Sequence, residues 1–254
     1  MYNTVLWQAS NAIGRLTINR PEALNALNTE VLDELSSVLL EHERDADLKA
    51  LVLTGAGRAF VAGADIADMS KMEPREAKLF ALRGQEIMQQ IAGFPVPVIA
   101  AINGFALGGG LELALACDIR LGSTKAKFGQ PEITLGITPG FAATARLGHL
   151  IGQSKAKELL FTGRVIGADE ALQLGLIDKI YEPEALLPAA EELAALIAKN
   201  SGATLRLLKS AINAVHPTIG TYEAEMFARC FYTQDQKEGM IAFLEKRPAK
   251  FKNR

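Results

Sequence analysis

Three consecutive glycines, Gly108–Gly110, constrain this chain more than any other feature of its sequence. They follow the apolar stretch Val96–Ile102, which predicts a buried strand, and they precede a helical pattern at Leu111–Ala116. A second short strand is expected at Asp118–Leu121. Glycine runs are costly in backbone entropy, so their presence between a strand and a helix indicates a backbone that is approached closely. The order strand, helix, strand predicts an α/β fold with parallel strand pairing.

The composition excludes several classes of protein. The chain has 254 residues, 27 Lys and Arg, 29 Asp and Glu, and a formal net charge of −2. This size supports a large core, and the charge balance gives no overall attraction for nucleic acid or anionic membranes. Cys117 and Cys230 are far apart, so a reducing compartment is expected. No leader-like or membrane-spanning stretch is recognised, and we expect a cytoplasmic protein.

The first half of the chain alternates strands and helices. Thr4–Asn19 reads as two strands around a turn at Ser10-Asn11, and Asn28 or Thr29 is a plausible N-cap for the helix that follows. Ala50–Thr54 predicts another short strand. Pro74 suits a first helical position and leads a second amphipathic helix.

The chain loses its strand character from about Pro183. Amphipathic patterns predict helices over four segments: Ala189–Lys199, Ala203–Val215, Tyr222–Tyr232 and Gln234–Glu245. Such a helical appendage fits subunit contacts and a simple helical cap about equally well.

Common catalytic motifs are absent. The sequence contains no GxGxxG that opens a helix, and no GxxxxGK[ST], GxSxG or HExxH. His42, His149 and His216 fall on separate predicted helices or their ends, without neighbours at metal-ligand spacing. We therefore expect structural histidines and no metal site.

The glycine run has a possible chemical purpose. Amide N–H groups at a helix N-terminus lack partners within the helix, and the helix dipole there favours negative charge. Glu112 follows within the first helical turn, so its carboxylate could lie near the same spot. The pattern fits an oxyanion site, and it also fits a tight packing turn with Glu112 as a favourable first-turn acid.

A second acid, Glu132, stands in a loop bounded by glycine and proline, between apolar residues. Burial there would raise its pKa toward that of a general acid, although a solvent-facing loop glutamate is equally compatible with the pattern. The small-residue bend Ala62–Asp65 could present further backbone N–H groups. Together these elements suit enolate chemistry: two amides for a carbonyl oxygen, and two carboxyls for a water molecule and a proton.

These residues resemble the crotonase, or enoyl-CoA hydratase/isomerase, family over essentially the whole chain. The matching motifs occur in one order: Asn19-Arg20-Pro21, Leu24-Asn25-Ala26-Leu27, Ala62-Gly63-Ala64-Asp65, Asn103-Gly104, Gly108-Gly109-Gly110 with Glu112, Cys117-Asp118, Phe128-Gly129-Gln130-Pro131-Glu132, Pro139-Gly140 and Glu245-Lys246-Arg247.

The resemblance implies a crotonase-like spiral of ββα units with a C-terminal helical trimerisation region. We expect residues 1–195 to form the core with the acyl-CoA site, and residues 196–254 to form the oligomerisation region. It also implies an acyl-CoA thioester substrate, no metal or redox cofactor, no nucleic-acid partner, and a homo-oligomer that is a trimer or a dimer of trimers.

The resemblance further implies roles for individual residues. The N–H groups of Ala64 and Gly109 would form an oxyanion hole for the thioester carbonyl. Glu112 would activate water for attack at the β-carbon, and Glu132 would exchange the proton at the α-carbon. The remaining residues would bind CoA, the last two of them from a neighbouring subunit: Leu24, Ala26, Ala62, Asp65, Ile66, Phe243 and Lys246.

Possession of both glutamates favours reversible syn addition of water to a 2-enoyl-CoA, giving a 3-hydroxyacyl-CoA. An enoyl-CoA isomerase or an acyl-CoA hydrolase is the alternative, since one scaffold hosts several reactions. RNA binding through a basic helical segment that includes Lys71 and Arg83 is a further, weaker alternative. Where hydratases usually read small-Gly-Gly-Thr-Gln-Arg, this chain has the sequence Phe141–Arg146, which we expect to affect acyl-chain preference more than reaction class.

Overall fold

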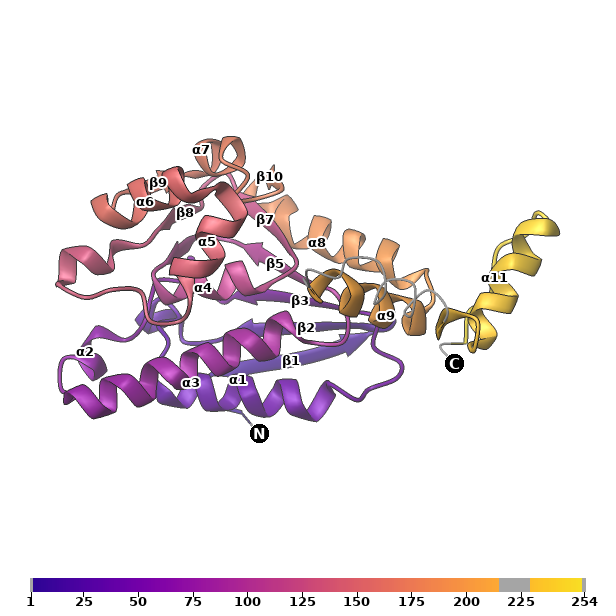
Figure 1. Cartoon of the computed structure of the whole chain (residues 1–254), viewed down its shortest axis with the longest axis horizontal. Helices are drawn as coiled ribbons and strands as arrows, with labels where there is room; N and C mark the ends of the chain where they lie inside the picture. The colour runs from indigo at the N-terminus through magenta and orange to yellow at the C-terminus, as the bar shows by residue number, and fades with distance from the viewer. Residues whose placement is uncertain (1, 215–228, 253–254) are drawn as a thin grey trace.

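The computed structural model describes residues 2–214 and 229–252, and it contains a larger and a smaller β-sheet (Figure 1). The six-stranded sheet has the order β1-β2-β3-β5-β7-β10, and the four-stranded sheet has the order β4-β6-β8-β9. The strands are β1 (Val5–Ser10), β2 (Ile13–Ile18), β3 (Ala50–Gly55), β4 (Ala59–Val61), β5 (Val98–Ile102), β6 (Phe105–Leu107), β7 (Ile119–Ser123), β8 (Lys127–Gly129), β9 (Val165–Gly167) and β10 (Lys179–Tyr181).

Helices flank both sheets and form the C-terminal part of the chain. The α-helices are α1 (Thr29–His42), α2 (Ile66–Met69), α3 (Pro74–Ala92), α4 (Gly109–Ala116), α5 (Ala143–Ile151), α6 (Gln153–Thr162), α7 (Ala168–Gln173), α8 (Pro183–Ala198), α9 (Gly202–Asn213) and α11 (Gln234–Leu244). The described residues also form two short 3-10 helices, η1 (Pro21–Ala23) and η2 (Pro131–Leu135).

Local sequence accounts for the first elements. Strands β1 and β2 pair antiparallel, and Asn11 and Ala12 between them both have positive φ, as a tight hairpin turn requires. The side chain of Asn28 accepts a hydrogen bond from the N–H of Val31 and caps α1. The hairpin and the N-cap predicted from the sequence are therefore confirmed.

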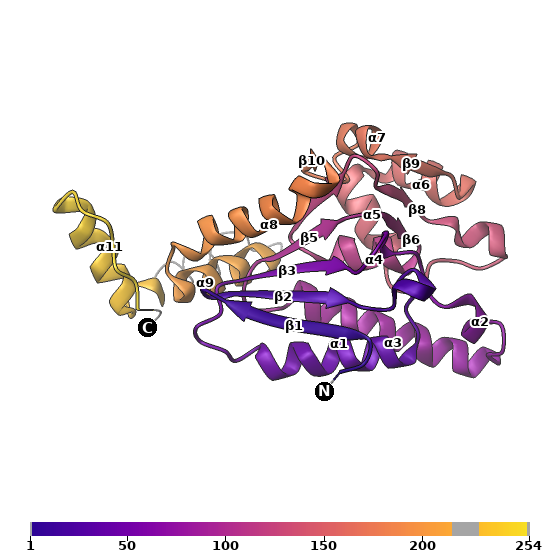
Figure 2. The ribbon, with the colours of Figure 1, turned by 180° about the vertical axis from the view of Figure 1, so that it is seen from behind.

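The central strands β3 and β5 are buried on both faces. Leu51 and Leu53 point into one hydrophobic core, whereas Ala50 and Val52 point into a second core on the other side of the sheet. This division follows from the two-residue period of a strand. Helix α8 covers the second face and α1 and α3 cover the first, as the two opposite views show (Figure 2).

The smaller sheet positions the chemistry. Its strands β4, β6 and β8 are neighbours and run parallel, so their carboxyl ends meet at one edge. Directly after these ends come three segments, Ala62–Asp65, Gly108-Gly109 and Gln130–Glu132. The parallel pairing of β5 with β7 is as predicted, but the sequence analysis did not anticipate this second sheet.

The C-terminal helices agree with the predicted segments where the structure describes them. Helices α8, α9 and α11 correspond to three of the four, and the predicted helix Tyr222–Tyr232 lies mostly outside the described residues. Helix α11 projects away from the rest of the molecule in both views (Figures 1 and 2). The predicted boundary at 195/196 falls within α8, whose residues Leu186, Ala190 and Ala194 pack on the main sheet. Within the described ranges, no helix is both long and apolar enough to cross a bilayer.

Candidate active site

The glycine turn predicted from the sequence forms a sharp entry into α4. Gly108 has a φ of 50°, a conformation that glycine adopts without strain. Gly110 lies directly on the carbonyl of Val61, so a Cβ at this position would overlap β4. Gly109 is the first residue of α4, and its N–H has no acceptor within the helix. The turn thus combines close packing with a buried backbone donor at the start of α4. The role of this donor in an oxyanion site stays a prediction.

Ala64 lies beside this turn. It forms an isolated parallel bridge with Leu27. The hydrogen bonds of this bridge are donated by the N–H groups of Leu27 and Asp65, so the N–H of Ala64 takes no part in them. A Cβ built on Gly109 would lie 3.5 Å from the Ala64 nitrogen. The two backbone donors named in the sequence analysis are therefore neighbours, and a single oxygen atom could meet both.

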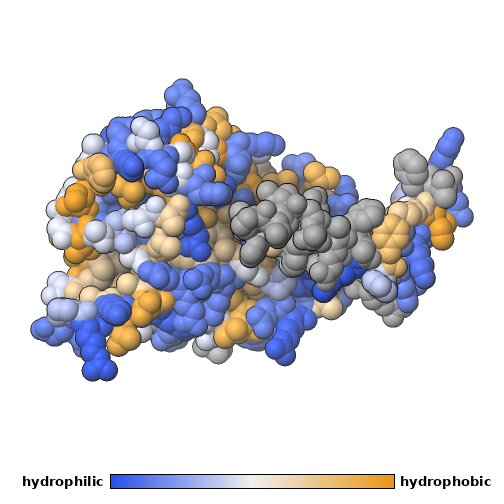
Figure 3. Space-filling view, viewed as in Figure 1, coloured by the Kyte–Doolittle hydropathy of each residue, from blue (hydrophilic) through white to orange (hydrophobic). Residues whose placement is uncertain are grey.

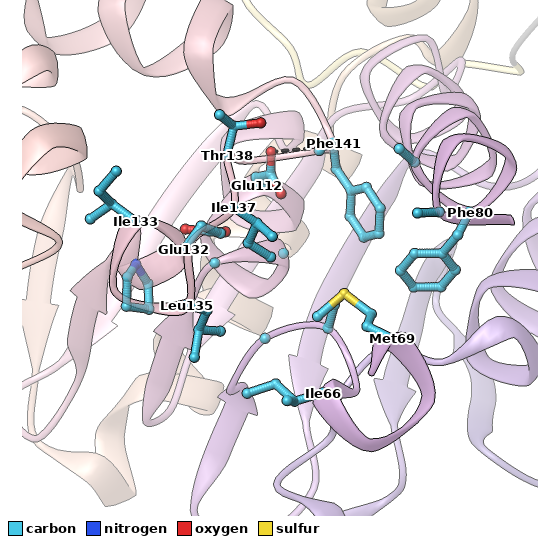
Figure 4. A pocket seen from close by; sticks show the side chains of 18 of the residues that line it. Ile66, Met69, Phe80, Glu112, Glu132, Ile133, Leu135, Ile137, Thr138 and Phe141 are labelled. Atoms are coloured by element: carbon cyan, nitrogen blue, oxygen red, sulfur yellow. Dashed lines mark hydrogen bonds between the residues drawn. The ribbon is translucent and has the colours of Figure 1, made fainter. Parts of the chain in front are cut away.

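Glu112 projects from the first turn of α4 and is 2% exposed. Its Oε1 accepts hydrogen bonds from the N–H groups of Phe141 and Ala143, each at 2.8 Å. Figure 4 shows the bond from Phe141. Both bonds reach the same oxygen, which leaves Oε2 available for other groups. The carboxyl is thus held in one orientation by a segment about thirty residues further along the chain.

Glu132 is the second buried carboxyl, 9% exposed, and belongs to η2. A Cβ on Gly108 would lie 2.7 Å from its Oε1, so the carboxyl rests against the glycine turn. The fully buried Gln130 lies next to it: with its amide nitrogen as donor, Gln130 reaches the two carboxyl oxygens at 2.9 and 3.0 Å. The solvent-facing reading of Glu132 is therefore wrong, because η2 turns the side chain inward.

The two carboxyls share an electrostatic environment. The pKa of Glu112 is raised to about 7, mainly by burial and in addition by the nearby charge of Glu132. The hydrogen bonds from the two backbone N–H groups and the charge of Arg146 lower this pKa and offset part of the rise. Burial also raises the pKa of Glu132. Raised pKa values of this kind suit groups that exchange protons near neutral pH. In the described parts of the chain, no group of three or more His, Cys, Asp and Glu side chains is arranged to hold a metal ion.

A cavity of about 810 Å³ opens beside these groups. Ala64, Gly109, Glu112 and Glu132 all contribute to its wall, and the rest of the lining is mainly apolar, as the close view shows (Figure 4). On the surface, apolar and hydrophilic residues alternate at the end of the molecule that carries α2 (Figure 3). A mostly apolar cavity with a few convergent polar groups is typical of a small-molecule site.

Five of the seven residues expected to contact CoA belong to two adjacent segments next to this cavity. Ala62 and Ile66 line it, and the N–H of Ala62 donates to the carbonyl of Leu24 at 3.0 Å. Arg20 joins the segments, because its guanidinium pairs with Asp65 at 3.3 Å and donates to the carbonyl of Ala26 at 2.7 Å. The structure thus brings the predicted residues together, and their contacts with CoA stay predictions.

The remaining two predicted residues lie elsewhere. Phe243 belongs to α11 and Lys246, which is exposed, follows that helix. Helix α11 projects from the end of the molecule opposite α2 (Figure 1), and Lys246 is not among the described residues that line the cavity. The contacts of these two residues with the CoA of a neighbouring subunit stay predictions.

Sequence reasoning missed the groups that hold the two carboxyls in place. No pattern predicts that the N–H groups of Phe141 and Ala143 bind Glu112, because the contact depends on how α4 and α5 pack. Gln130 was noticed only as part of a motif. Its spacing of two residues from an acid expected to be buried was the signal that could have indicated its contact with Glu132.

Comparison with known proteins agrees with this geometry. The family model of enoyl-CoA hydratase/isomerase matches residues 8–254. The chain is 48% identical, over 99% of both sequences, to a short-chain-enoyl-CoA hydratase of Clostridium acetobutylicum. It is 47% identical, over 98% of both, to a crotonyl-CoA hydratase of Syntrophomonas wolfei. A crystal structure of an enoyl-CoA hydratase from Bacillus anthracis matches with a TM-score of 0.96 at 37% identity, covering 99% of this chain and 100% of that one.

The chain therefore belongs to the enoyl-CoA hydratase/isomerase, or crotonase, family, and it has the α/β crotonase fold with two mixed sheets and C-terminal helices. The family and fold predicted from the sequence motifs are confirmed.

Proposed function

We propose that this protein is an enoyl-CoA hydratase, a hydro-lyase that adds water reversibly and syn across the 2,3-double bond of a 2-enoyl-CoA. The observation that carries the proposal is the pair of buried carboxyls, Glu112 and Glu132, beside the neighbouring backbone donors of Ala64 and Gly109. Two similar proteins that align over nearly the whole chain bear the names short-chain-enoyl-CoA hydratase and crotonyl-CoA hydratase.

The first part of the reaction concerns the carbonyl oxygen. In the proposed complex, the N–H groups of Ala64 and Gly109 donate to the thioester oxygen and draw electrons from the double bond. As water attacks the β-carbon, that oxygen gains the negative charge of an enolate, which the two donors and the N-terminus of α4 stabilise. Backbone donors fixed by the glycine turn need little reorganisation during this step.

The second part concerns protons. Ionised Glu112 takes one proton from the attacking water, whose oxygen bonds to the β-carbon. The electron pair of the double bond moves to the α-carbon, and protonated Glu132 donates its proton there. The addition is syn because both carboxyls face the same side of the bound acyl group. Dehydration reverses each proton transfer. In either direction the two carboxyls together carry one proton before the reaction and one proton after it, but the proton ends on the other carboxyl.

This site fits hydration better than the alternatives. An isomerase moves a proton between two carbons and needs one acid–base group, whereas here two carboxyls lie buried at one turn. An acyl-CoA hydrolase would aim its water at the carbonyl carbon, where no additional base lies among the described residues of the cavity. RNA binding has weak support, because Arg83 is paired with Asp33 and Glu86.

Coenzyme A and the assembly belong to the same proposal. The substrate is an acyl-CoA thioester, with Leu24, Ala26, Ala62, Asp65 and Ile66 contacting CoA, and with Phe243 and Lys246 reaching it from a second copy. The exposed apolar side chains of Leu208 and Ile212 on α9, 54% and 67% exposed, support a homo-oligomer, either a trimer or a dimer of trimers. Sedimentation velocity distinguishes these two states from a monomer.

The experiment that tests the function is an assay with crotonyl-CoA followed by product mass. Hydration adds one water, isomerisation leaves the mass unchanged, and hydrolysis releases free CoA. We expect loss of the enoyl-thioester absorbance and a product heavier by one water. Free CoA or an isobaric product as the main result, formed by a folded protein, would contradict the proposal.

A further inference from the structure

Phe141 is one of the residues that form the wall of the cavity. It is 3% exposed and lies between α3 and the N-terminus of α4. On the α3 side it occupies the space that a Cβ of Gly84 would need. Phe80 supports it, with ring centroids 5.4 Å apart and ring planes tilted by 58° (Figure 4). Because Gly84 has no side chain, the aromatic ring packs directly against the backbone of α3 at this position. The ring therefore cannot move further toward α3.

The ring also lies directly beside the two backbone donors. A Cβ on Gly109 would be 3.3 Å from the Cδ2 and Cε2 atoms of Phe141, and 3.5 Å from the nitrogen of Ala64. These values place the ring edge and both donors around one small volume. A carbonyl oxygen bound there leaves its acyl chain only a few ångströms from the ring.

The backbone of Phe141 indicates which part of the acyl chain meets the ring. Its N–H holds Glu112, the carboxyl assigned to the β-carbon, at 2.8 Å. The CoA side of the cavity is formed by Ala62 and Ile66, from the segment that contacts Leu24. The Phe141 ring therefore lies on the side of the β-carbon, where the fourth and later carbons of the chain would extend.

We infer that Phe141, packed against Gly84, is the residue that limits the length of the acyl group. The protein then prefers enoyl-CoA substrates with short acyl groups of about four to six carbons. This inference rests on the proposed hydratase function. A longer chain has to displace a ring that is packed on both sides, and a hydrophobic pocket discriminates by roughly 10–200-fold for each group that it does not accommodate.

The test measures kcat/KM for 2-enoyl-CoA thioesters of four, six, eight, ten and twelve carbons. For the unmodified protein we expect kcat/KM to fall steeply beyond about six carbons. Phe141→Ala should raise the ten-carbon to four-carbon ratio by about tenfold or more. Phe141→Leu keeps more of the apolar volume, should fold if the alanine variant does not, and should raise the ratio in the same direction.

Two further variants make the test specific. Ile133→Ala removes an apolar side chain from the Glu132 side of the same cavity and should leave the ratio within about twofold. Gly84→Ala should push the ring toward the donors and lower kcat/KM even with the four-carbon substrate. Adding Phe141→Ala to Gly84→Ala should recover most of that loss, because the clash requires the ring.

The outcomes separate the inference from the function on which it rests. If no chain length is hydrated, the proposed function fails. If all lengths are hydrated equally well by the unmodified protein, the function stands and the length limit is wrong. The limit is also wrong if folded Phe141 variants lower kcat/KM by the same factor for every substrate, since that result assigns Phe141 only to holding Glu112.

Discussion

The two segments that carry the carboxyls differ in how they hold them. Glu112 lies on α4, a helix in which every residue is buried, and two backbone N–H groups fix one of its oxygens. Glu132 lies on η2, where its near neighbours Ile133 and Leu135 are 49% and 50% exposed, and the side-chain amide of Gln130 lies beside the carboxyl. Glu112 therefore belongs to a helix of the core, whereas Glu132 is the buried residue of a segment that lies at the surface.

This difference corresponds to the work assigned to each group. A carboxylate that orients water has to hold its position before the substrate is bound, and fixed backbone donors accomplish this. A carboxyl that exchanges a proton at the α-carbon meets an atom of the substrate, so its position is completed on binding. The comparison shows that burial can raise the pKa of a carboxyl in two mechanically different environments.

The largest expected effect comes from removing either acid. Glu112→Gln and Glu132→Gln should each lower kcat for hydration of crotonyl-CoA by about 10³-fold or more, since general acid–base catalysis contributes roughly 10²–10⁴. Glu86→Gln, an exposed acid on α3, serves as the control and should keep nearly full activity. Full activity in either active-site variant would remove that residue from the mechanism.

Shortening the side chains tests the comparison itself. Glu112→Asp cannot reach the donors of Phe141 and Ala143 from the fixed helix α4, and a displacement of about 1 Å can cost on the order of 10² in rate. Glu132→Asp should cost less, about tenfold, because η2 can adjust. Steady-state kinetics on both variants decides this, and equal losses would show that the two segments are equally rigid.

The pH dependence should show the raised pKa of Glu112. Hydration needs this group ionised, and burial holds its pKa at about 7, so kcat/KM should fall by about tenfold per unit as the pH drops below about 7. Because the charge of Arg146 lowers this pKa, Arg146→Gln should shift the acid limb to higher pH. An acid limb near the ordinary glutamate value in the unmodified protein contradicts the burial argument.

The smallest expected effect concerns the backbone that holds Glu112. Ala142 has a φ of 84°, and an alanine in this left-handed region costs about 1 kcal/mol relative to glycine, partly offset by the greater unfolded-state entropy of glycine. Ala142→Gly should therefore raise the free energy of unfolding by about 0.5 kcal/mol. The neighbouring Ala143→Gly, in the first position of α5, should lower it by about 1 kcal/mol. Denaturant unfolding measures both, and changes of the same sign would contradict the strain at Ala142.

The sequence predicted the elements that are set by local patterns. The hairpin follows from its turn, α1 from the N-cap Asn28, and the buried strands β3 and β5 from their apolar runs. It did not reveal β4, β6 and β8, because each has three residues and exists only through pairing with strands distant in the chain.

The site was predicted to a similar extent. The motif around Gly108–Gly110 indicated Glu112 and the backbone donor of Gly109, and the proline–glycine loop indicated Glu132. The anchoring of Glu112 by Phe141 and Ala143 could not be read, since it depends on the packing of α5 against α4 and on a left-handed alanine that no propensity predicts.

The central claim is that Glu112 serves the β-carbon and Glu132 the α-carbon. Hydrogen–deuterium exchange at the α-carbon of butyryl-CoA in D₂O tests it most directly, because this saturated thioester can exchange its α-proton but can neither add nor lose water. The account predicts that Glu112→Gln keeps most of the exchange seen with the unmodified protein, whereas Glu132→Gln loses it. Normal exchange in Glu132→Gln, together with its loss in Glu112→Gln, would reverse the assignment and contradict the account.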